Sequence, residues 1–411
     1  MDDRKFKKNI IQLLTICVFA GIFPLSGCSA KSENEPAGKV LEESEIIQPE
    51  DTQSELAEEK TQELATEEIH PPTVTVIMVG DVLLHTRVEE SAKTEAGSYD
   101  FAPIFANVKE EVEAADLAMV NQEVIIGGEE LGVSGYPTFN APYEVADELV
   151  DTGFDVICHA TNHALDKGKK GITNCLNYWQ ESYPDTAVLG IHNSKEDQEE
   201  IYIAQCQGMK IAILNYTYGT NGISLPEDMP YAVDLLEESR VKEDLAKAEE
   251  LADFTIVCPH WGTEYSLEKT DEQDRWVNIF YEGGADLILG THPHVIEPVE
   301  MIEGEKGQML VYYSLGNFVN WTSGTGSGVA NRMVGGMAKV TLTRDAEEVT
   351  ISEYDMLPLV SHVSPGFGGV TTYFFDDYSN ELADENAIRS QDMSFSYEYI
   401  EQLLQDVIEI K

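Results

Sequence analysis

The sequence predicts a layered α/β fold, and three observations support this prediction. Short apolar, β-branched runs alternate with segments of helical spacing over most of the chain, as in parallel strands joined by crossover helices. The runs contain few polar residues, which is typical of strands buried on both faces. Past His294 the pattern changes to β-hairpins, which we interpret as a second sheet packed on the first.

The first strand and the first helix show the patterns that define the elements. Val74–Val79 is a continuous apolar, β-branched run, and Phe101–Ala115 has the apolar spacing of one helix face. By the same criteria, further strands are predicted at Leu117–Val120, Phe154–Cys158, Ala187–Leu189, Tyr202–Cys206, Lys210–Tyr216, Thr255–Cys258, Leu287–Leu289, Pro298–Ile302, Met309–Ser314, Met337–Leu342 and Glu348–Tyr354. Further helices are predicted at Tyr143–Thr152, Lys169–Tyr183, Glu237–Leu251, Glu272–Tyr281 and Tyr397–Ile410.

Residues 1–28 have the features of a bacterial lipoprotein signal. Arg4–Lys8 is basic, Ile10–Phe23 is apolar, and Leu25–Cys28 fits the lipobox, in which the cysteine is kept and carries lipid. The apolar run is shorter than the roughly 20 residues of a membrane-spanning helix, although an uncleaved anchor helix is the alternative. Both interpretations place the folded part at the extracellular face of the cell membrane, with lipid on Cys28 as the expected anchor.

Residues 29–71 are predicted to be an acidic, disordered tether, and residues 72–411 to be the folded domain. The tether is rich in Glu, Ser, Thr, Gln, Ala and Pro and has almost no aromatic residues. Such a composition cannot bury enough surface to offset the entropy lost on ordering.

The cysteines of the predicted domain leave two interpretations open. Apolar surroundings suit buried thiols, whereas an extracellular location also permits one disulfide. Spacing alone does not decide between these for Cys158, Cys175, Cys206 and Cys258.

The charge balance restricts the partners of the protein. It has 75 acidic and 26 basic residues, a formal net charge of −49. A protein this acidic does not bind nucleic acid or anionic lipid through its general field, but it attracts divalent cations. A polyanionic substrate is repelled unless a metal ion or a local basic patch bridges the contact.

Five apolar runs stop on side chains of the types that bind metal ions. In an open α/β sheet, side chains at the carboxyl ends of neighbouring strands border the same crevice. Carboxylate and amide oxygens suit hard cations, and imidazole is a common ligand of transition metals. The sequence therefore predicts a metal centre with one or two ions, formed by Asp81, Asn121, Glu123, Asn162, His163, His260, His292 and His294.

The sharpest local signal is the pair His292 and His294, because two histidines on either side of a proline can face one centre. The other motifs each have an ordinary structural alternative. Asp81 also fits a capped turn, and a histidine at a strand end, such as His260, is often simply hydrogen-bonded. The number of these motifs favours a site over the alternatives.

The motifs GD, N-x-E, NH-x-x-D-x-G-x-x-G, HWG-x-E-Y, G-x-HPHV and SLGNF follow one another between Val74 and Phe318. In this order they resemble the CapA family of capsule and poly-γ-glutamate biosynthesis proteins. That family is similar in fold to the calcineurin-like metallophosphoesterases, in which helices flank a β-sandwich in four layers and strand-end residues hold two metals. The resemblance therefore implies a metallophosphoesterase-like domain with a divalent metal centre of Mn, Zn or Fe.

The resemblance also implies a role for each residue of the motifs. Glu123 takes the place of the bridging acid, and His163 stands near the leaving group as the proton donor. The implied metal ligands are Asp81, Glu123, Asn162, His260, His292 and His294; the implied catalytic residues are His163 and Asp166; the implied substrate-binding residues are Asn121, Trp261, Glu264, Tyr265, Asn317 and Phe318.

The chain departs from the metallophosphoesterase pattern in three places. Leu83 stands where the first strand usually carries a histidine, and His85 lies two residues further on. Thr161 and Thr291 replace a frequent asparagine and a frequent histidine. These departures predict a weakened first-metal site, so that only one ion binds tightly.

Three functions fit these features. The first is a divalent-metal-dependent hydrolase or transferase of poly-γ-glutamate or capsule biosynthesis, acting at the cell surface on a phosphoester or on the anionic polymer. The second is a non-catalytic partner that binds nascent polyglutamate in the metal crevice for a membrane synthetase or exporter. The third, which the clustered ligands disfavour, is a solute-binding lipoprotein that has lost its metals.

Overall fold

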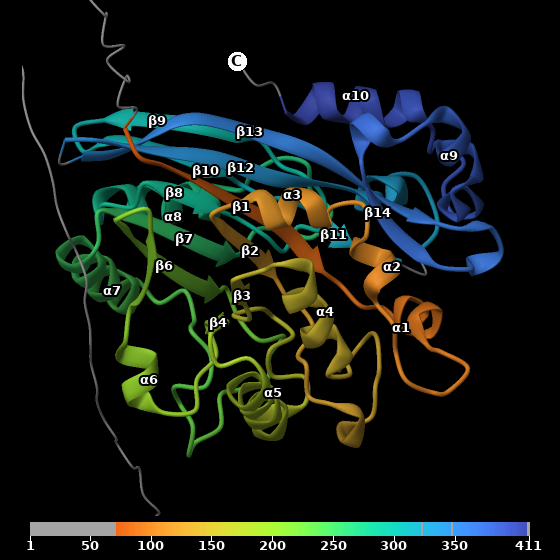
Figure 1. Cartoon of the computed structure of the whole chain (residues 1–411), viewed down its shortest axis with the longest axis horizontal. Coiled ribbons are helices and arrows are strands. Elements are labelled where there is room, and N and C mark those ends of the chain that lie inside the picture. Colours follow the sequence, from red (N-terminus) through yellow and green to blue (C-terminus); the bar gives the residue numbers. More distant parts are fainter. Residues whose placement is uncertain (1–70, 322–323, 347, 409–411) are drawn as a thin grey trace, which may run out of the picture. The chain divides into compact units, whose positions relative to one another are not determined.

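Two β-sheets form the centre of the folded domain (Figure 1). The computed structural model describes residues 71–321, 324–346 and 348–408, all within the compact unit Glu68–Lys411. The predicted lipoprotein signal with Cys28, and all but the last residue of the predicted tether, lie outside the described residues. In the described ranges, no helix is long and apolar enough to cross a membrane.

The two sheets differ in size and strand order. The first has eight strands in the order β14-β13-β12-β1-β2-β3-β4, with β11 paired to β1; the second has six in the order β5-β6-β7-β8-β10-β9. The strands of the first sheet are β1 (Thr73–Val82), β2 (Leu117–Asn121), β3 (Val156–Cys158), β4 (Ala187–Leu189), β11 (Asn317–Val319), β12 (Val334–Asp345), β13 (Glu348–Val363) and β14 (Val370–Phe374). Those of the second sheet are β5 (Tyr202–Cys206), β6 (Met209–Thr217), β7 (Phe254–His260), β8 (Leu287–Leu289), β9 (Val299–Gly304) and β10 (Gly307–Tyr312).

The central strands of both sheets are parallel. In the first sheet β1 to β4 run in the same direction, and in the second sheet β6, β7, β8 and β10 do so. The carboxyl ends of each set therefore lie at one end of their sheet, where polar side chains that follow the strands are brought together.

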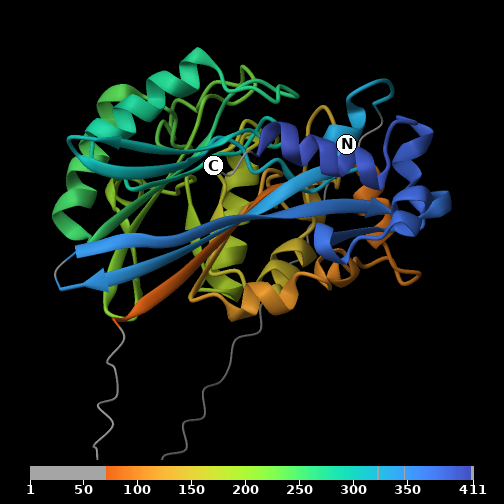
Figure 2. The ribbon, with the colours of Figure 1, turned by 90° about the horizontal axis from the view of Figure 1, so that it is seen from above.

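Helices cover the outer faces of the sheets, which gives four layers. The helices α7 (Glu238–Leu251) and α8 (Asp271–Glu282) pack on the second sheet through an apolar cluster of their own. The helices α2 and α3 (orange in Figure 2) lie on the opposite side of the strands, and α4 packs against both. This architecture confirms the predicted α/β sandwich flanked by helices. The remaining bounds are α1 (Thr86–Ala92), α2 (Ala102–Phe105), α3 (Lys109–Ala114), α4 (Glu144–Thr152), α5 (Gly168–Ser182), α6 (Lys195–Glu199), α9 (Asn380–Glu385) and α10 (Tyr397–Val407).

The chain is divided between the two sheets differently from the prediction. The hairpin β9–β10 does not begin a new sheet, because β10 pairs in parallel with β8. The later strands β12 to β14 return to the first sheet, where β12 is antiparallel to β1. β10 thereby supplies hydrogen-bond partners to the edge of β8, and β12 supplies them to the edge of β1. The segment after His294 thus contributes to both sheets, and the second sheet begins at β5.

The predicted helix Phe101–Ala115 is interrupted and forms α2 and α3. Residues 106–108 make a turn between them, and both Phe105 and Val108 remain buried. The apolar spacing therefore predicted the buried face correctly, but it did not predict the break that follows Phe105.

The cysteines of the domain, Cys158, Cys175, Cys206 and Cys258, are free thiols. Burial raises the pKa of the Cys175 thiol to about 12, and burial together with the neighbouring Cys158 raises the pKa of Cys258. Because the thiolate is the reactive form, Cys175 and Cys258 behave as inert core residues at neutral pH.

A close approach of the backbones of β1 and β11 depends on Gly80. The Asp81 amide donates to the Gly316 carbonyl oxygen at 2.9 Å, and a Cβ atom on Gly80 would lie 1.9 Å from that oxygen. We expect Gly80→Ala to force the strands apart and to lower the free energy of unfolding by about 3 kcal/mol, as measured by urea denaturation. Gly219→Ala is the control, since nothing lies within 4 Å of its Cβ position. Equal losses in the two variants would contradict this packing argument.

Candidate metal centre

Side chains from the strand ends of both sheets meet in one crevice. Each of them is buried. The first sheet contributes Asp81, Asn121, Glu123, Asn162, His163 and Asn317, and the second sheet contributes His260, His292 and His294. The structure thus brings together the predicted ligand residues from sequence positions more than 200 residues apart, as the 3.3 Å contact between Asp81 and the His292 amide shows.

Asp81, near the end of β1, is bonded through both carboxylate oxygens. Its Oδ1 accepts a hydrogen bond from Asn121 Nδ2 at 2.8 Å, and its Oδ2 lies 3.1 Å from His294 Nδ1. The backbone amide of His292 also donates to Oδ2, at 3.3 Å. Asp81 therefore ties the end of the first sheet to the loop that follows β8.

Glu123 lies among three histidines. Its Oε1 atom is 3.6 Å from His294 Nε2, 3.9 Å from His163 Nε2 and 4.0 Å from His260 Nε2. The residue is completely buried, and neither carboxylate oxygen has a hydrogen-bond partner among the described residues. Burial raises the pKa of Glu123; His294 opposes this shift and Asp81 reinforces it. A buried, ionised carboxyl without a hydrogen-bond partner is destabilising, and a metal ion bound beside it would offset that cost.

The histidines of the second sheet differ in charge. Burial and the neighbouring histidines lower the pKa of His260 and of His292, so both imidazoles are neutral at pH 7. Burial also acts to lower the pKa of His294, but Glu123 and Asp81 outweigh it and raise that pKa to about 9. A neutral imidazole offers a lone pair to a metal ion, whereas His294 must release a proton to act as a ligand.

A second group of ligand atoms surrounds His260. Its Nε2 atom lies 3.0 Å from Asn162 Oδ1, and its Nδ1 atom lies 3.0 Å from Thr291 Oγ1. The ring centroids of His260 and His292 are 4.7 Å apart. His260 Nδ1 also lies 3.9 Å from Asp81 Oδ1, so this group adjoins the group formed by Asp81 and His294.

The loop after β8 holds its two histidines in a strained conformation. His292 has a φ of 102° and His294 a φ of 60°, both in the region that favours glycine. Such a conformation costs a non-glycine residue about 1–3 kcal/mol and persists where the surrounding structure enforces it. This backbone conformation orients the two imidazoles toward the crevice, and such strain is typical of functional sites.

These residues fit a divalent cation. Glu123, His292 and His294 each offer a ligand atom, and these atoms lie within 4.8 Å of one another. Besides the two oxygens of Glu123, Asn121 Oδ1 and His292 Nδ1 are buried without a hydrogen-bond partner in the described part of the chain. Carboxylate, amide and imidazole groups are suitable ligands for Mn, Zn or Fe. The structure therefore offers a candidate site for a divalent metal, whose identity and number of ions stay predictions.

Comparison with known families identifies the chain. The family model described as "Bacterial capsule synthesis protein PGA_cap" matches residues 75–322. The chain belongs to this family. Over 261 residues it is 28% identical to the "PGA biosynthesis protein CapA" of Bacillus subtilis (strain 168), covering 59% of this chain and 63% of that protein. It is 26% identical over 261 residues to the "Capsule biosynthesis protein CapA" of Bacillus anthracis, covering 61% of each. The predicted resemblance to the CapA family is confirmed, although the chain spans less than two thirds of the length of these relatives.

Two solved structures show more distant similarity to this PGA_cap family member. One is a 5'-nucleotidase precursor from Thermus thermophilus, at 13% identity and a TM-score of 0.44, covering 82% of this chain and 59% of that chain. The other is the calcineurin-like phosphoesterase YfkN from Bacillus subtilis, at 11% identity and a TM-score of 0.37, covering 82% and 96%. The calcineurin-like phosphoesterase bears the name of the fold family that the motifs resemble.

His163 is held in place by Asp166. The His163 Nδ1 atom lies 2.7 Å from Asp166 Oδ2, which also accepts the amide of Phe139 at 2.6 Å. Because a carboxylate only accepts hydrogen bonds, Nδ1 carries the hydrogen and Nε2 faces Glu123. Asp166 therefore contacts the side of His163 opposite Nε2 and can position the ring. Its predicted catalytic role stays a prediction.

Two predicted substrate-binding residues lie in the apolar core instead. Trp261 packs in the cluster beneath α8, and its Nε1 donates to a backbone carbonyl oxygen at 2.9 Å. Phe318 packs against Phe105, with ring centroids 5.4 Å apart. Successive side chains of an extended backbone point to opposite faces, so His260 and Asn317 face the crevice while the residues after them face the core. Trp261 also lines a cavity with Tyr218, and the predicted roles of Trp261 and Phe318 toward a substrate stay predictions.

The other predicted substrate-binding residues border the crevice. Asn317 Oδ1 lies 3.1 Å from His294 Nδ1, and Asn121 bonds Asp81 as described above. The Tyr265 ring lies 5.9 Å from the His294 ring, centroid to centroid. Glu264 is near enough to help raise the pKa of Glu123, after the larger effects of burial and the nearer groups. Their roles toward a substrate stay predictions.

Some residues of the crevice were missed by the sequence analysis. Tyr218 and Asn221 follow β6: the Tyr218 ring is 4.6 Å from the His292 ring, and Asn221 Nδ2 is 3.4 Å from His163 Nδ1. Because β6 also ends in a run of polar residues, the same strand-end signal could have identified them. Thr161, one of the departures from the family pattern, donates its hydroxyl to the Glu123 carbonyl oxygen at 2.7 Å and so orients that segment.

His85 lies at the rim of the crevice, next to Phe139, with ring centroids 5.3 Å apart. Burial, together with the nearby His294, His163 and Arg332, lowers its pKa to about 4. His85 is therefore close to the ligand cluster, but it is outside the group formed by Glu123, His292 and His294. The predicted weakness of the first-metal site stays a prediction.

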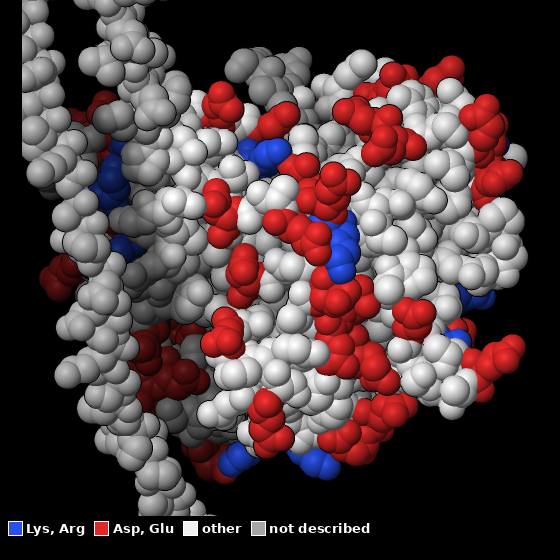
Figure 3. All heavy atoms as spheres, viewed as in Figure 1, with Lys and Arg blue, Asp and Glu red and all other residues white. Residues whose placement is uncertain are grey.

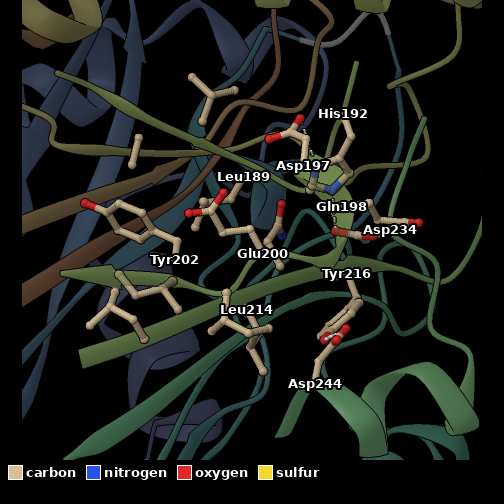
Figure 4. A pocket seen from close by; sticks show the side chains of 17 residues that line it. Leu189, His192, Asp197, Gln198, Glu200, Tyr202, Leu214, Tyr216, Asp234 and Asp244 are labelled. Atoms are coloured by element: carbon tan, nitrogen blue, oxygen red, sulfur yellow. Dashed lines mark hydrogen bonds and ion pairs between the residues drawn. The ribbon is translucent and has the colours of Figure 1, made fainter. Parts of the chain in front are cut away.

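A cavity of about 460 Å³ lies at the edges of the two sheets, lined by β4, β5 and β6 (Figure 4). None of the predicted site residues lines it. At one end His192 is bonded between two carboxylates: Nε2 is 2.7 Å from Asp234 Oδ2, and Nδ1 is 3.4 Å from Asp197 Oδ2. Both ring nitrogens are thus engaged, and this group stabilises the edge of the domain.

The His192 group predicts a loss of stability in alkali. Burial alone would lower the pKa of His192, but Asp197 and Asp234 outweigh it and raise the pKa to about 9. A raised pKa means that the stabilisation is complete below the unfolded value near 6.5 and is lost as the pH rises through 9. We expect a loss of up to about 3 kcal/mol in the free energy of unfolding, which His192→Gln should remove. Identical pH profiles for wild type and variant between about pH 6 and pH 10 would contradict this.

Proposed function

We propose that this PGA_cap family member is a divalent-metal-dependent hydrolase or transferase of capsule or poly-γ-glutamate biosynthesis, anchored by lipid on Cys28 at the extracellular face of the membrane. Family membership supports the biological process. The observation that carries the chemistry is Glu123, a fully buried carboxyl without a hydrogen-bond partner among the described residues, within 4.0 Å of three imidazoles. A metal ion in the crevice would stabilise the ionised form of this carboxyl.

The residues that would hold a cation are Glu123, His292 and His294, with Asp81, Asn162 and His260 beside them. When bound, a divalent cation supplies Lewis-acid polarisation of a substrate oxygen and makes a water molecule more acidic. Asn121 and Asn317 hold Asp81 and His294 in place through hydrogen bonds of 2.8 Å and 3.1 Å. Thr291 does the same for His260 at 3.0 Å. The supporting hydrogen bonds keep the ligand atoms aimed at the crevice.

The protein itself supplies the proton transfer. Asp166 accepts the His163 Nδ1–H, which leaves His163 Nε2 facing the crevice; with a proton on Nε2 as well, the ring would donate that proton to the leaving oxygen or nitrogen and keep the one on Nδ1. Phe139 packs against the His163 ring, with centroids 4.6 Å apart, and shields it from water on that side. The His163 amide donates to Thr161 Oγ1 at 3.2 Å, which fixes the backbone beneath the ring.

A hydrolysis assay tests the proposal. We expect the full chain to release nitrophenol from a nitrophenyl phosphodiester, or short fragments from poly-γ-glutamate, when Mn²⁺ is present. Chelation should abolish this turnover, and readdition of Mn²⁺ should restore it. Tight binding of polyglutamate without turnover on either substrate would instead favour the non-catalytic partner of a membrane synthetase or exporter.

A further inference from the structure

Arg332 is a cation placed at the mouth of an acidic crevice. It belongs to the 3-10 turn Val329–Met333, which leads into β12, and it is half-buried. Its guanidinium carbon lies 3.5 Å from the centroid of the Tyr265 ring, a close cation–π contact. The Tyr265 ring in turn contacts the His294 ring. Arg332 is therefore one aromatic ring away from a candidate metal ligand.

The backbone of Arg332 is fastened to the ligand network. Its carbonyl oxygen accepts hydrogen bonds from Asn317 Nδ2 at 2.9 Å and from Asn320 Nδ2 at 3.3 Å. The other end of the Asn317 side chain lies 3.1 Å from His294 Nδ1. One amide thus positions both the His294 imidazole and the backbone of Arg332.

Glu264, which precedes Tyr265 in the chain, interacts with the Tyr265 side chain. Burial raises the pKa of Tyr265 to about 12, and electrostatic repulsion from Glu264 adds to this, together with their side-chain hydrogen bond. Tyr265 itself has a φ of 68°, a strained value for a tyrosine. Glu264, Tyr265 and Arg332 therefore form a connected, pre-organised group beside the histidines.

The acidic charge of the chain makes a local cation necessary for binding an anionic polymer. The formal net charge is −49, and the face in Figure 3 shows many more carboxylates than basic side chains. A polyanion is repelled by such a surface and needs a cation where it enters. Arginine is the side chain best suited to this task, because its planar fork matches an oxyanion with two parallel hydrogen bonds.

Building on the proposed function, we propose that Arg332, stacked on Tyr265, is an anion-binding subsite that takes a free carboxylate of a γ-linked glutamate chain lying in the metal crevice. A carboxylate brings one negative charge to one guanidinium. A phosphate dianion would bring two charges close to Glu264 and gain no second cation from this group. The subsite therefore selects a polymer of carboxylates over a phosphorylated one.

Binding measurements on the Mn²⁺-loaded full chain test this subsite separately from catalysis. The probes are a short oligo-γ-glutamate, the same oligomer with its free carboxylates converted to amides, and inorganic phosphate. We expect Arg332→Gln to weaken binding of the acidic oligomer about 10- to 100-fold, with an intermediate loss for Arg332→Lys, which keeps the charge without the fork. Binding of the amidated oligomer, Mn²⁺ affinity and melting temperature should stay unchanged.

Arg275→Gln is the matched control, because Arg275 on α8 also stacks on an aromatic ring, 5.0 Å from the centroid of Trp276, but is already ion-paired with Glu238 and Glu272. It should bind the acidic oligomer as the wild type does. Equal binding by Arg332→Gln and wild type, or an equal loss for the amidated oligomer, would overturn the subsite. The subsite would also be overturned if phosphate, at the same concentration as the oligomer, displaced the oligomer from the wild type but not from Arg332→Gln. Arg332-dependent binding without turnover would leave the subsite standing and refute the proposed catalysis.

Discussion

Glu123→Gln should lose divalent-cation binding and, without metal, become more stable than the wild type. The amide keeps the size of the side chain but cannot neutralise a cation between the histidines, so we expect Mn²⁺ affinity to fall about 100-fold or more. Burial raises the pKa of Glu123, which means that its ionised form is destabilising in the folded state above the unfolded value near 4.5. Without metal at neutral pH, the variant should therefore gain about 1–3 kcal/mol in the free energy of unfolding.

Titration calorimetry and urea denaturation measure the two effects of Glu123→Gln separately. Glu305→Gln, in the exposed turn between β9 and β10, makes the same chemical change on the surface and should alter neither quantity. A Glu123→Gln protein that kept wild-type Mn²⁺ affinity would show that the crevice binds no ion through this carboxylate. One that lost stability without metal would show that the carboxylate is satisfied in the metal-free protein.

His163→Ala should abolish most turnover while leaving metal binding almost intact. The His163 imidazole faces the crevice, with its Nε2 atom 3.9 Å from Glu123 Oε1. From there we expect it to donate a proton but to contribute little to binding a cation. Loss of a general acid lowers the turnover number about 10²- to 10⁴-fold. Steady-state assays with Mn²⁺, alongside titration calorimetry, should show this separation.

Two further variants locate the effect of His163. Asp166→Asn should also slow turnover, because the amide no longer fixes the hydrogen on His163 Nδ1. His192→Gln removes an equally buried imidazole from the edge of the domain and should leave turnover at neutral pH unchanged. If His163→Ala lost Mn²⁺ affinity as strongly as Glu123→Gln does, His163 would be a ligand and not the proton donor.

The sequence predicted the strands of the site well, because each is a buried apolar run that ends on a polar residue. Val74–Val79 lies within β1, and its following residues Gly80 and Asp81 reach the crevice as expected. The motif pattern also predicted the family correctly. The sheet to which a strand belongs was less predictable. The hairpin β9–β10 could extend either sheet, and only the free edge of β8 decided between them.

The residues around the crevice were harder to predict for a different reason. Trp261 and Phe318 follow true crevice residues in the chain, but the alternation of an extended backbone turns them to the core. Arg332 has no motif around it, because its place beside Tyr265 is set by Asn317 and Asn320 across a turn. Such residues are positioned by tertiary contacts that local spacing does not encode.

The crevice takes its groups from both halves of the sandwich, Glu123 from one sheet and His292 from the other. A cation bound to both is a removable cross-link between the layers. We expect loss of the cation to let the ends of β2 and β8 separate more readily, without any change in the strands themselves. Amide hydrogen exchange at those strand ends would then report occupancy by the ion, whether or not a reaction takes place.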